Sequence, residues 1–279
     1  MTCSPQPQPQ HRTRTSVSIL ILETDVLPAS AGKVSTAFEK LFSRAGAEQH
    51  PRIDVAVTPH YVVDCELPPV EDLQKYDGVL ITGSKYDAHG DDAWIMKLVE
   101  WIQVAWRKYP DTRFTGVCFG HQILARAVLG ATVKNHPTTW ELAATEVELS
   151  SLGRELFATG QETLVLHQMH QDYVDLESDE SCERGCGGKD LKPNVWGSSK
   201  DCPVQGFYVH KRIFTTQGHL GYDEVMVRES IEEIQERGGL PRDKEVEAAK
   251  EAGELEHDGD IVAGAILRFL AEWDDDIRP

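Results

Sequence analysis

The amino-acid sequence predicts an α/β fold, with a mostly parallel central sheet flanked by helices and with extra antiparallel strands. Three observations support this prediction. Apolar, strand-like runs alternate with amphipathic, helix-like segments through the first half of the chain, as in parallel sheets covered by helices on both faces. Glycine-containing turns follow several of these runs. The second half carries shorter strand candidates separated by loops, which suit antiparallel strands.

The chain has 279 residues, which is enough for one large α/β domain, and we expect that domain over residues 16–279. Residues 1–15 are rich in Pro and Gln, cannot bury a core, and are expected to form a disordered tail. In the first half, the pattern predicts strands at 17–22, 53–57, 78–82 and 114–117, and helices at 34–45, 94–106 and 122–129.

In the second half, short β-rich runs predict strands at 145–149, 162–167, 204–208 and 213–216, and apolar spacing predicts a last helix at 261–273. The stretch 177–201 is rich in Gly, Lys, Ser and Asp, and is expected to be a surface loop. Gly46 is expected to end the first helix, because glycine commonly terminates helices.

The chain is strongly acidic, with 46 Asp and Glu against 28 Lys and Arg and a formal charge of −18. The acidic residues are spread along the chain, which is the ordinary pattern of a soluble protein. This balance argues against nucleic acid and anionic membranes as partners, because both repel a negatively charged protein.

Cysteine usage and hydropathy predict a cytoplasmic protein. Six cysteines in a chain of this size do not form the dense disulfide framework of a small secreted domain, and free thiols fit them better. The first residues lack the apolar run of a signal peptide, and no stretch approaches the roughly 18–20 apolar residues that cross a bilayer.

The most informative segment is Gly116-Val117-Cys118-Phe119-Gly120, which places a cysteine between glycines, after a β-like run and before a helix-like one. Sharp strand-to-helix turns of this kind carry the nucleophile of many α/β enzymes, and the glycines allow the tight turn. A helix N-terminus beside the sulfur favours the thiolate, which is the reactive form of cysteine. The alternative is a buried structural cysteine.

A thiol nucleophile needs a base, and position separates three of the eleven histidines from the rest. His219 comes just after the predicted strand at 213–216, on a turn that contains glycine, and is the first choice. His167 and His170 follow the strand that is expected to end at Leu166.

Acyl transfer also needs hydrogen-bond donors for the oxyanion of the intermediate. The backbone N–H of Phe119 at the start of the predicted helix is one source. The N–H groups of the turn at Gly83 and Ser84 are another, because this turn follows a neighbouring strand. For Gly83 and Ser84 the alternative is an ordinary tight turn.

These segments resemble a known family when they are taken in order: I-T-G-S at 81–84, G-V-C-F-G-H-Q at 116–122, W-E at 140–141, H-Q-D at 170–172 and Q-G-H at 217–219. The resemblance is to the class I glutamine amidotransferases and extends over residues 17–273. It implies a flavodoxin-like fold of that family's type, with Cys118 as the nucleophile and His219 as its base. Phe119, with Gly83 or Ser84, would supply the oxyanion donors.

The resemblance also implies a set of substrate contacts. Gln122 matches a residue that contacts the γ-glutamyl group, and Trp140 and Glu141 match a segment that lines the substrate pocket. His170 and Asp172 belong to the H-Q-D segment and are included among the substrate-binding candidates.

The chain departs from the family pattern directly after the histidine. The family usually continues Q-G-H-P-E, where the Glu orients the histidine, but this chain has Leu220 and Gly221. A catalytic histidine without its carboxylate loses control of its tautomer, although a cysteine nucleophile depends less on that help than a serine does. Asp172, Asp223 or Glu224 could replace the missing carboxylate.

No cofactor is expected. Cys182, Cys186, Cys202 and His210 could be drawn as a zinc site, but their spacing fits no strong pattern, and incidental thiols in a loop are favoured. The chain has no phosphate-binding loop and no dinucleotide fingerprint, so any ATP-dependent synthetase step would lie on a partner chain.

These features favour a cysteine hydrolase that cleaves a glutamine or γ-glutamyl amide of a small molecule through a thioester intermediate. A stand-alone γ-glutamyl hydrolase is preferred over an ammonia-supplying subunit, because no synthetase domain is fused to the chain. Gly221 leaves two alternatives open. One is a repurposed hydrolase, lyase or cyclase that acts on a non-glutamine metabolite with the same Cys/His site, and the other is a catalytically silent scaffold or regulatory subunit.

Overall fold

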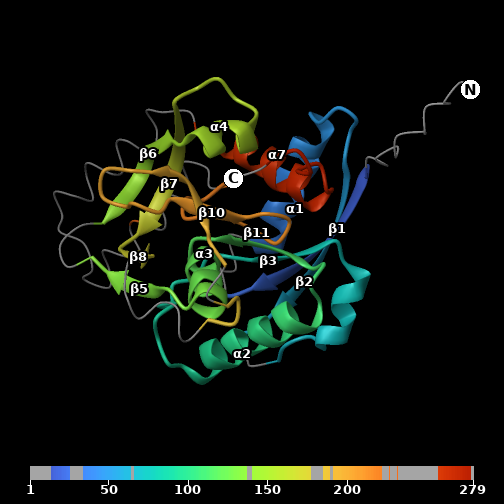
Figure 1. Cartoon of the computed structure of the whole chain (residues 1–279), viewed down its shortest axis with the longest axis vertical. Helices are drawn as coiled ribbons and strands as arrows, with labels where there is room; N and C mark the ends of the chain where they lie inside the picture. The colour runs from blue at the N-terminus through green and yellow to red at the C-terminus, as the bar shows by residue number, and fades with distance from the viewer. Residues whose placement is uncertain are drawn as a thin grey trace, which may run out of the picture.

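Figure 1 shows the computed structural model, in which helices lie on both sides of one large sheet. The structure describes residues 14–25, 34–63, 66–136, 140–176, 185–188, 191–221, 226, 231 and 257–277. Over these residues, the large sheet has nine strands in the order β2-β1-β3-β4-β11-β10-β9-β6-β7, and β5 and β8 form a separate two-stranded sheet. The predicted α/β fold is confirmed.

The strands of the large sheet are β1 (Ser16–Glu23), β2 (Asp54–Tyr61), β3 (Gly78–Ile81), β4 (Arg113–Val117), β6 (Glu141–Leu149), β7 (Thr163–His170), β9 (Asn194–Ser198), β10 (Gly206–Val209) and β11 (Ile213–Thr216). The small sheet consists of β5 (Thr132–Asn135) and β8 (Asp172–Asp175). The helices are α1 (Val34–Ala47), α2 (Ala93–Lys108), α3 (Phe119–Leu124), α4 (Ser151–Phe157) and α7 (Gly259–Leu270), with a 3₁₀ helix η1 (Val70–Lys75) and a π-helical segment η2 (Ala125–Leu129) that continues α3.

The large sheet divides into a parallel half and an antiparallel half. β2, β1, β3, β4 and β11 are parallel to one another. Beyond β11, the strands β10, β9, β6 and β7 are each antiparallel to the neighbour before them. The extra antiparallel strands that the second half of the sequence predicts therefore extend the parallel sheet on one side.

Two apolar cores lie on opposite faces of the sheet, and β1 contributes to both. Ile19 and Ile21 of β1 pack with α1, α4 and α7, whereas Leu20 and Leu22 pack with α2 and α3. Figure 1 shows the two groups of helices on opposite sides of the strands. All four side chains are almost fully buried, and each such side chain contributes about 1.5–3 kcal/mol relative to an exposed one.

Several boundaries differ from the prediction because of tertiary packing. Gly46 does not end α1, which continues to Ala47. A Cβ at Gly46 would overlap the carbonyl of Ile53, so the glycine is required where the helix packs against the chain that enters β2. The last helix ends at Leu270, and Trp273 lies beyond it with its indole N–H donating to the carbonyl of Arg14 at 3.0 Å.

The stretch 177–201 is not entirely a loop, because it contains β9 in the large sheet. Trp196 of this strand is fully buried, and its indole N–H donates to the carbonyl of Thr215 at 2.7 Å. The surrounding Gly and Ser residues hid this strand. Part of the stretch, including Cys182, lies outside the described residues.

Two predicted strands are longer than expected. β6 begins at Glu141 and β7 runs to His170, and the two pair from Glu141 with His170 to Glu148 with Thr163. His167 and His170 therefore lie inside β7 and do not follow it, contrary to the prediction. Polar residues at these strand ends are buried in a hydrogen-bonded network, which an apolar pattern cannot reveal.

The predicted tail, residues 1–15, lies mostly outside the described residues. Thr15, the last residue of this segment, directly precedes β1, and its carbonyl accepts a hydrogen bond from the backbone N–H of Asp54. Within the described ranges, none of the helices has the length and apolar character that a membrane span requires.

Candidate active site

Three neighbouring parallel strands bring the predicted catalytic residues together. β4 lies between β3 and β11, and the three are in register, with Gly116 of β4 opposite Ile81 of β3 and Val117 opposite Thr216 of β11. Gly83, Cys118 and His219 follow the carboxyl ends of β3, β4 and β11. The carboxyl edge of a parallel sheet is where α/β proteins bind ligands.

Cys118 occupies a strained turn. Its φ of 52° and ψ of −108° lie in a region that non-glycine residues rarely adopt and that costs about 1–3 kcal/mol. The turn is held by the N–H of Cys118, which donates to the carbonyl of Thr216 at 2.9 Å. A Cβ at Gly116 would overlap Gly120, and a Cβ at Gly120 would overlap the carbonyl of Ile81, so both glycines are required by close packing.

The side chains of Cys118 and His219 border the same small space in front of Gly83. A Cβ at Gly83 would lie 3.0 Å from Cε1 of His219 and 3.5 Å from Cβ of Cys118. The position of His219 is fixed by its backbone N–H, which donates to the carbonyl of His167 at 2.8 Å in an isolated bridge to β7. The structure therefore places the predicted nucleophile and the predicted base beside each other.

Burial sets the protonation of both groups. It raises the pKa of the Cys118 thiol to about 12, although the backbone N–H of Phe119 and the amide of Gln217 lower it. Burial also lowers the pKa of His219 to about 3, helped by the nearby His170 and His167. The expected stabilisation of the thiolate by the start of α3 is therefore outweighed, and the free site holds a neutral thiol and a neutral imidazole at pH 7.

The loop after β3 is tied to the end of β1. Thr24 donates through its hydroxyl to the carbonyl of Gly83 at 2.9 Å, and the hydroxyl of Ser84 donates to the carbonyl of Thr24 at 2.6 Å. The N–H of Lys85 donates to Asp25 at 2.8 Å and is thus already used. These contacts hold the two predicted oxyanion donors of this loop, Gly83 and Ser84, next to the strand-to-helix turn at Cys118.

Gln122 and Asp172 belong to the hydrogen-bonded surroundings of Gln217, the amide that contacts the thiol. The Gln122 amide donates to the backbone carbonyl of Asp172 and to the side chain of Gln217, each at 3.0 Å. The Asp172 carboxylate accepts from Asn135 at 2.8 Å and from His89 at 3.0 Å, and its charge raises the pKa of Cys118. Asp172 therefore puts a negative charge in the wall of the site. Trp140 directly precedes β6 and is half-buried.

Glu141 and His170 form a buried ion pair behind this wall. Nδ1 of His170 donates to the carbonyl of Asp172, and Nε2 donates to Glu141, each at 2.9 Å. Both ring nitrogens of His170 therefore face acceptor oxygens. Burial pushes the pKa of Glu141 up, but hydrogen bonds from His170, Ser199 and Gln205 hold it below its usual value.

Glu141 and His170 also lie close to Cys202. Ligand atoms of Glu141, His170 and Cys202 lie within 4.8 Å of one another. Both oxygens of Glu141 already accept hydrogen bonds, and a zinc ion would need four ligands at about 2.0–2.3 Å. We therefore describe the group as a hydrogen-bonded network. His210, a member of the zinc set drawn from the sequence, instead contacts the Tyr208 hydroxyl at 3.2 Å.

The sequence predicts that Asp172, Asp223 or Glu224 replaces the family's Glu beside His219. The described groups that shift the pKa of His219 are His170 and His167, and Asp172 is not one of them. Asp223 and Glu224, two of the three carboxylates considered from the sequence, lie outside the described residues.

Sequence reasoning missed the amides around the thiol. Gln205 is fully buried and donates to Glu141 at 2.7 Å and accepts from Gln168 at 2.9 Å. Gln217 is fully buried and faces Cys118. The available signal was a glutamine directly before or after a short apolar strand, since an amide at such a place has to find partners in the interior.

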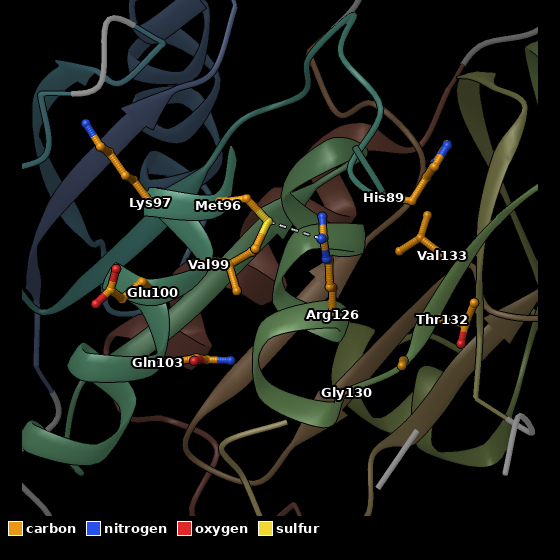
Figure 2. A pocket seen from close by; sticks show the side chains of 11 residues that line it. His89, Met96, Lys97, Val99, Glu100, Gln103, Arg126, Gly130, Thr132 and Val133 are labelled. Carbon is orange, nitrogen blue, oxygen red and sulfur yellow. Dashed lines mark hydrogen bonds between the residues drawn. The ribbon is translucent and has the colours of Figure 1, made fainter. Parts of the chain in front are cut away.

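A groove of about 650 Å³ is lined by residues of α2, η2 and β5 and by His89. Figure 2 shows Arg126 between the two walls, with His89 and Val133 to one side and Met96 to the other. The lining residues are His89, Met96, Lys97, Val99, Glu100, Gln103, Arg126, Gly130, Ala131, Thr132 and Val133.

Residues 38–224 match the family model described as glutamine amidotransferase class-I. The chain belongs to this family. Among its class I glutamine amidotransferase relatives, a glutamine amidotransferase-like protein of Schizosaccharomyces pombe is 32% identical over 207 residues, which cover 74% of this chain and 77% of the relative.

Gamma-glutamyl peptidase 3 of Arabidopsis thaliana is 30% identical over 178 residues, which cover 62% of this chain and 66% of that protein. Among solved structures, a glutamine amidotransferase of Thermotoga maritima superposes with a TM-score of 0.62 at 19% identity, and the match covers 91% of this chain and 98% of that one. At this identity the structural match establishes the fold of the class I glutamine amidotransferases.

Proposed function

We propose that this class I glutamine amidotransferase-type protein is a cysteine hydrolase that cleaves γ-glutamyl amides through a thioester. The observation that carries the proposal is the convergence of Gly83, Cys118 and His219 after three adjacent parallel strands. Nucleophile, base and oxyanion donors are the groups that acyl transfer requires, and here they share one small space.

In the first step, the sulfur of Cys118 attacks the γ-carbonyl carbon while His219 takes the thiol proton. Because the free thiol and imidazole are both neutral, this proton moves as the carbon–sulfur bond forms. The carbonyl oxygen becomes an oxyanion that accepts hydrogen bonds from the backbone of Phe119 and of the Gly83 loop. His219 then protonates the leaving amine as the carbon–nitrogen bond breaks.

In the second step, water attacks the thioester and His219 takes its proton. The carbon–sulfur bond breaks, the proton returns to the sulfur of Cys118, and the γ-glutamyl group leaves with a free carboxylate.

Asp172 supports a γ-glutamyl substrate. Its carboxylate is buried, lies close enough to raise the pKa of Cys118, and is oriented by Asn135 and His89. Such a group would attract the α-ammonium of a γ-glutamyl moiety. The name of the Arabidopsis relative, a gamma-glutamyl peptidase, supports γ-glutamyl amides over other amides as the substrate. We expect the reaction to take place in the cytoplasm on a small molecule, without nucleic acid or membrane partners.

The test is release of glutamate from glutamine and from a panel of γ-glutamyl amides by the full chain. Cys118→Ala is expected to abolish release, whereas Cys186→Ala, the same change at a half-buried cysteine, is expected to retain it. Absence of turnover together with an inert Cys118 would overturn the proposal in favour of a silent scaffold. A Cys118 that is alkylated rapidly without turnover of any γ-glutamyl compound would favour a repurposed enzyme. Glutamine turnover that needs an added synthetase chain would favour an ammonia-supplying subunit.

A further inference from the structure

Gln217 brings an amide to the sulfur of Cys118 that the proposed mechanism does not use. It follows β11 directly, where Thr216 lies opposite Val117, so it is level with Cys118 on the neighbouring strand. The carbonyl of Thr216 accepts from the N–H of Cys118 at 2.9 Å, which holds the two chains together at this point. The side chain of Gln217 is fully buried and contacts the thiol.

Two hydrogen bonds fix which way the Gln217 amide points. The backbone carbonyl of Asp172 can only accept, so the group of Gln122 that faces it at 3.0 Å is the NH₂ group. The same NH₂ group lies 3.0 Å from the side chain of Gln217, so Gln217 presents its oxygen there. The NH₂ group of Gln217 is thereby left for Cys118.

This NH₂ group lacks a good acceptor before the reaction. Over the part of the chain that the structure describes, Nε2 of Gln217 is buried and has no hydrogen-bond partner of ordinary geometry. A neutral thiol is a weak acceptor, and burial keeps the Cys118 thiol neutral at pH 7. A thiolate accepts a much stronger hydrogen bond, because one partner is charged. The donor therefore gains its full partner only when the sulfur becomes negative.

The other groups around the sulfur leave this task to Gln217. The charge of Asp172 raises the pKa of Cys118, and His219 is neutral at pH 7 because burial lowers its pKa to about 3. The described groups that lower the pKa of Cys118 are the backbone N–H of Phe119 and the amide of Gln217. Since the N–H of Phe119 is needed for the oxyanion, Gln217 is the donor that remains for the sulfur.

We propose that Gln217 is a further catalytic residue, which donates from Nε2 to the sulfur of Cys118 while that sulfur carries negative charge. This inference rests on the proposed function and adds a donor for the sulfur to the donors for the oxygen. An interaction that is weak before the reaction and strong during it lowers the barrier, whereas one that is equally strong throughout does not.

The donor acts twice in the reaction. As the thiol proton passes to His219 and the sulfur lone pair bonds to the γ-carbonyl carbon, Nε2 of Gln217 stabilises the negative charge on the sulfur. After water has attacked the thioester, the carbon–sulfur bond breaks and its electron pair returns to the sulfur. Gln217 stabilises this departing thiolate until His219 returns the proton. The amide itself neither gains nor loses a proton.

The first test needs no substrate and measures alkylation of Cys118 by iodoacetamide in the full chain at pH 9 and 10, followed by mass spectrometry of the Cys118 peptide. Gln217→Met keeps the length of the side chain and removes its donor, so the thiolate fraction at a given pH should fall about tenfold. A more basic thiolate is more nucleophilic, so the measured rate should fall by about three- to tenfold. Gln103→Met, the same change at a half-buried amide of α2, is the control and should keep the wild-type rate.

Gln217→Glu is the second variant, and it decides the question if Gln217→Met does not fold. It keeps the size of the side chain and an oxygen that accepts from Gln122, but it turns a negative charge toward the sulfur in place of a donor. Alkylation should therefore be slower than in wild type and slower than in Gln217→Met. A wild-type rate in either folded variant would overturn the inference.

The second test uses the γ-glutamyl amide that wild type hydrolyses fastest. Gln217→Met should lower kcat by about tenfold with little change in KM, because the donor acts on charge that appears only during the reaction. A raised KM with unchanged kcat would mean that Gln217 contacts the substrate instead, and would overturn its role at the sulfur. If wild type hydrolyses no γ-glutamyl amide, the proposed function fails, and the alkylation rates still decide whether Gln217 acts on the sulfur.

Discussion

Gly83 and His219 are in contact across the candidate active site, since a Cβ on the glycine would lie 3.0 Å from Cε1 of the imidazole. The loop after β3 and the turn after β11 are thus packed together, and Cys118 borders both. The absence of a side chain at position 83 is what leaves room for the histidine to stand beside the thiol.

Gly83→Ala is therefore expected to displace His219 and to lower kcat by at least about tenfold, equivalent to about 1.4 kcal/mol in the barrier, with little change in stability. The matched control is Gly160→Ala, because nothing lies within 4 Å of a Cβ at that position. Steady-state kinetics and urea unfolding of both variants provide the measurement. A Gly83→Ala enzyme with wild-type kcat would show that His219 does not depend on this space.

The pH dependence of alkylation tests the protonation of Cys118. Burial raises the pKa of its thiol to about 12, so only a very small fraction is thiolate at pH 7. The rate of inactivation by iodoacetamide should therefore be slow at neutral pH and should still be rising above pH 9, where an ordinary thiol levels off. A rate that reaches its plateau below pH 8 would contradict this prediction.

The strands that carry the candidate catalytic residues were predictable because each has a simple local pattern. Strand β11 was predicted with its observed bounds, and the strand before Cys118 was missed by only one residue at its start. A continuous apolar run that ends in a glycine turn is typical of a buried parallel strand, and three such runs end at Gly83, Cys118 and His219. The order of the α/β elements favours β3 beside β4, whereas the place of β11 beside β4 is seen only in the structure.

What the sequence did not reveal depends on tertiary burial. The start of α3 pointed to a stabilised thiolate, but the enclosure of Cys118 by other elements reverses the balance. β9 was hidden because Trp196 is its only large apolar side chain at full burial, amid Gly and Ser residues. Glu141 and His170 were substrate-binding candidates outside the predicted strands, and only their pairing across β6 and β7 brings them into one network.

Two buried histidines predict how stability responds to acid. Burial lowers the pKa values of His121 and His219 to about 3, below their unfolded value of 6.5. Between pH 6.5 and 3 the unfolded chain binds protons that the folded chain excludes, so stability should fall as the pH is lowered through this window. Above pH 6.5 both histidines are neutral in the folded and the unfolded chain, so this loss of stability is absent there.

His121→Asn removes one of these groups, and the free energy of unfolding should then fall less steeply between pH 6.5 and 4 than in wild type. The slope is the useful quantity, because the lost hydrogen bond between His121 and Thr215 shifts the whole curve without changing its steepness. Urea unfolding at several pH values measures this slope. An unchanged slope would mean that His121 is protonated in the folded protein.

The last prediction concerns a buried charge pair that anchors the chain after α7. Arg113 at the start of β4 donates to Asp274 at 2.8 Å, and the Tyr208 hydroxyl donates to the other oxygen of Asp274 at 2.6 Å. Arg113 and Asp274 are 5% and 2% exposed. The guanidinium also lies 4.9 Å from the ring centroid of Phe269, so it is enclosed on several sides.

Asp274→Ala would leave the Arg113 charge buried without its partner, and should lower the free energy of unfolding by about 3–5 kcal/mol. Asp260→Ala is the matched control, because Asp260 pairs with Arg44 at the surface, where such a pair contributes about 1 kcal/mol or less. Urea unfolding of the two variants at pH 7.5 measures both effects. Equal, small effects would mean that water or another side chain reaches Arg113. A large effect confined to Asp274→Ala would show that the segment after α7 is fastened to β4, the strand that carries Cys118.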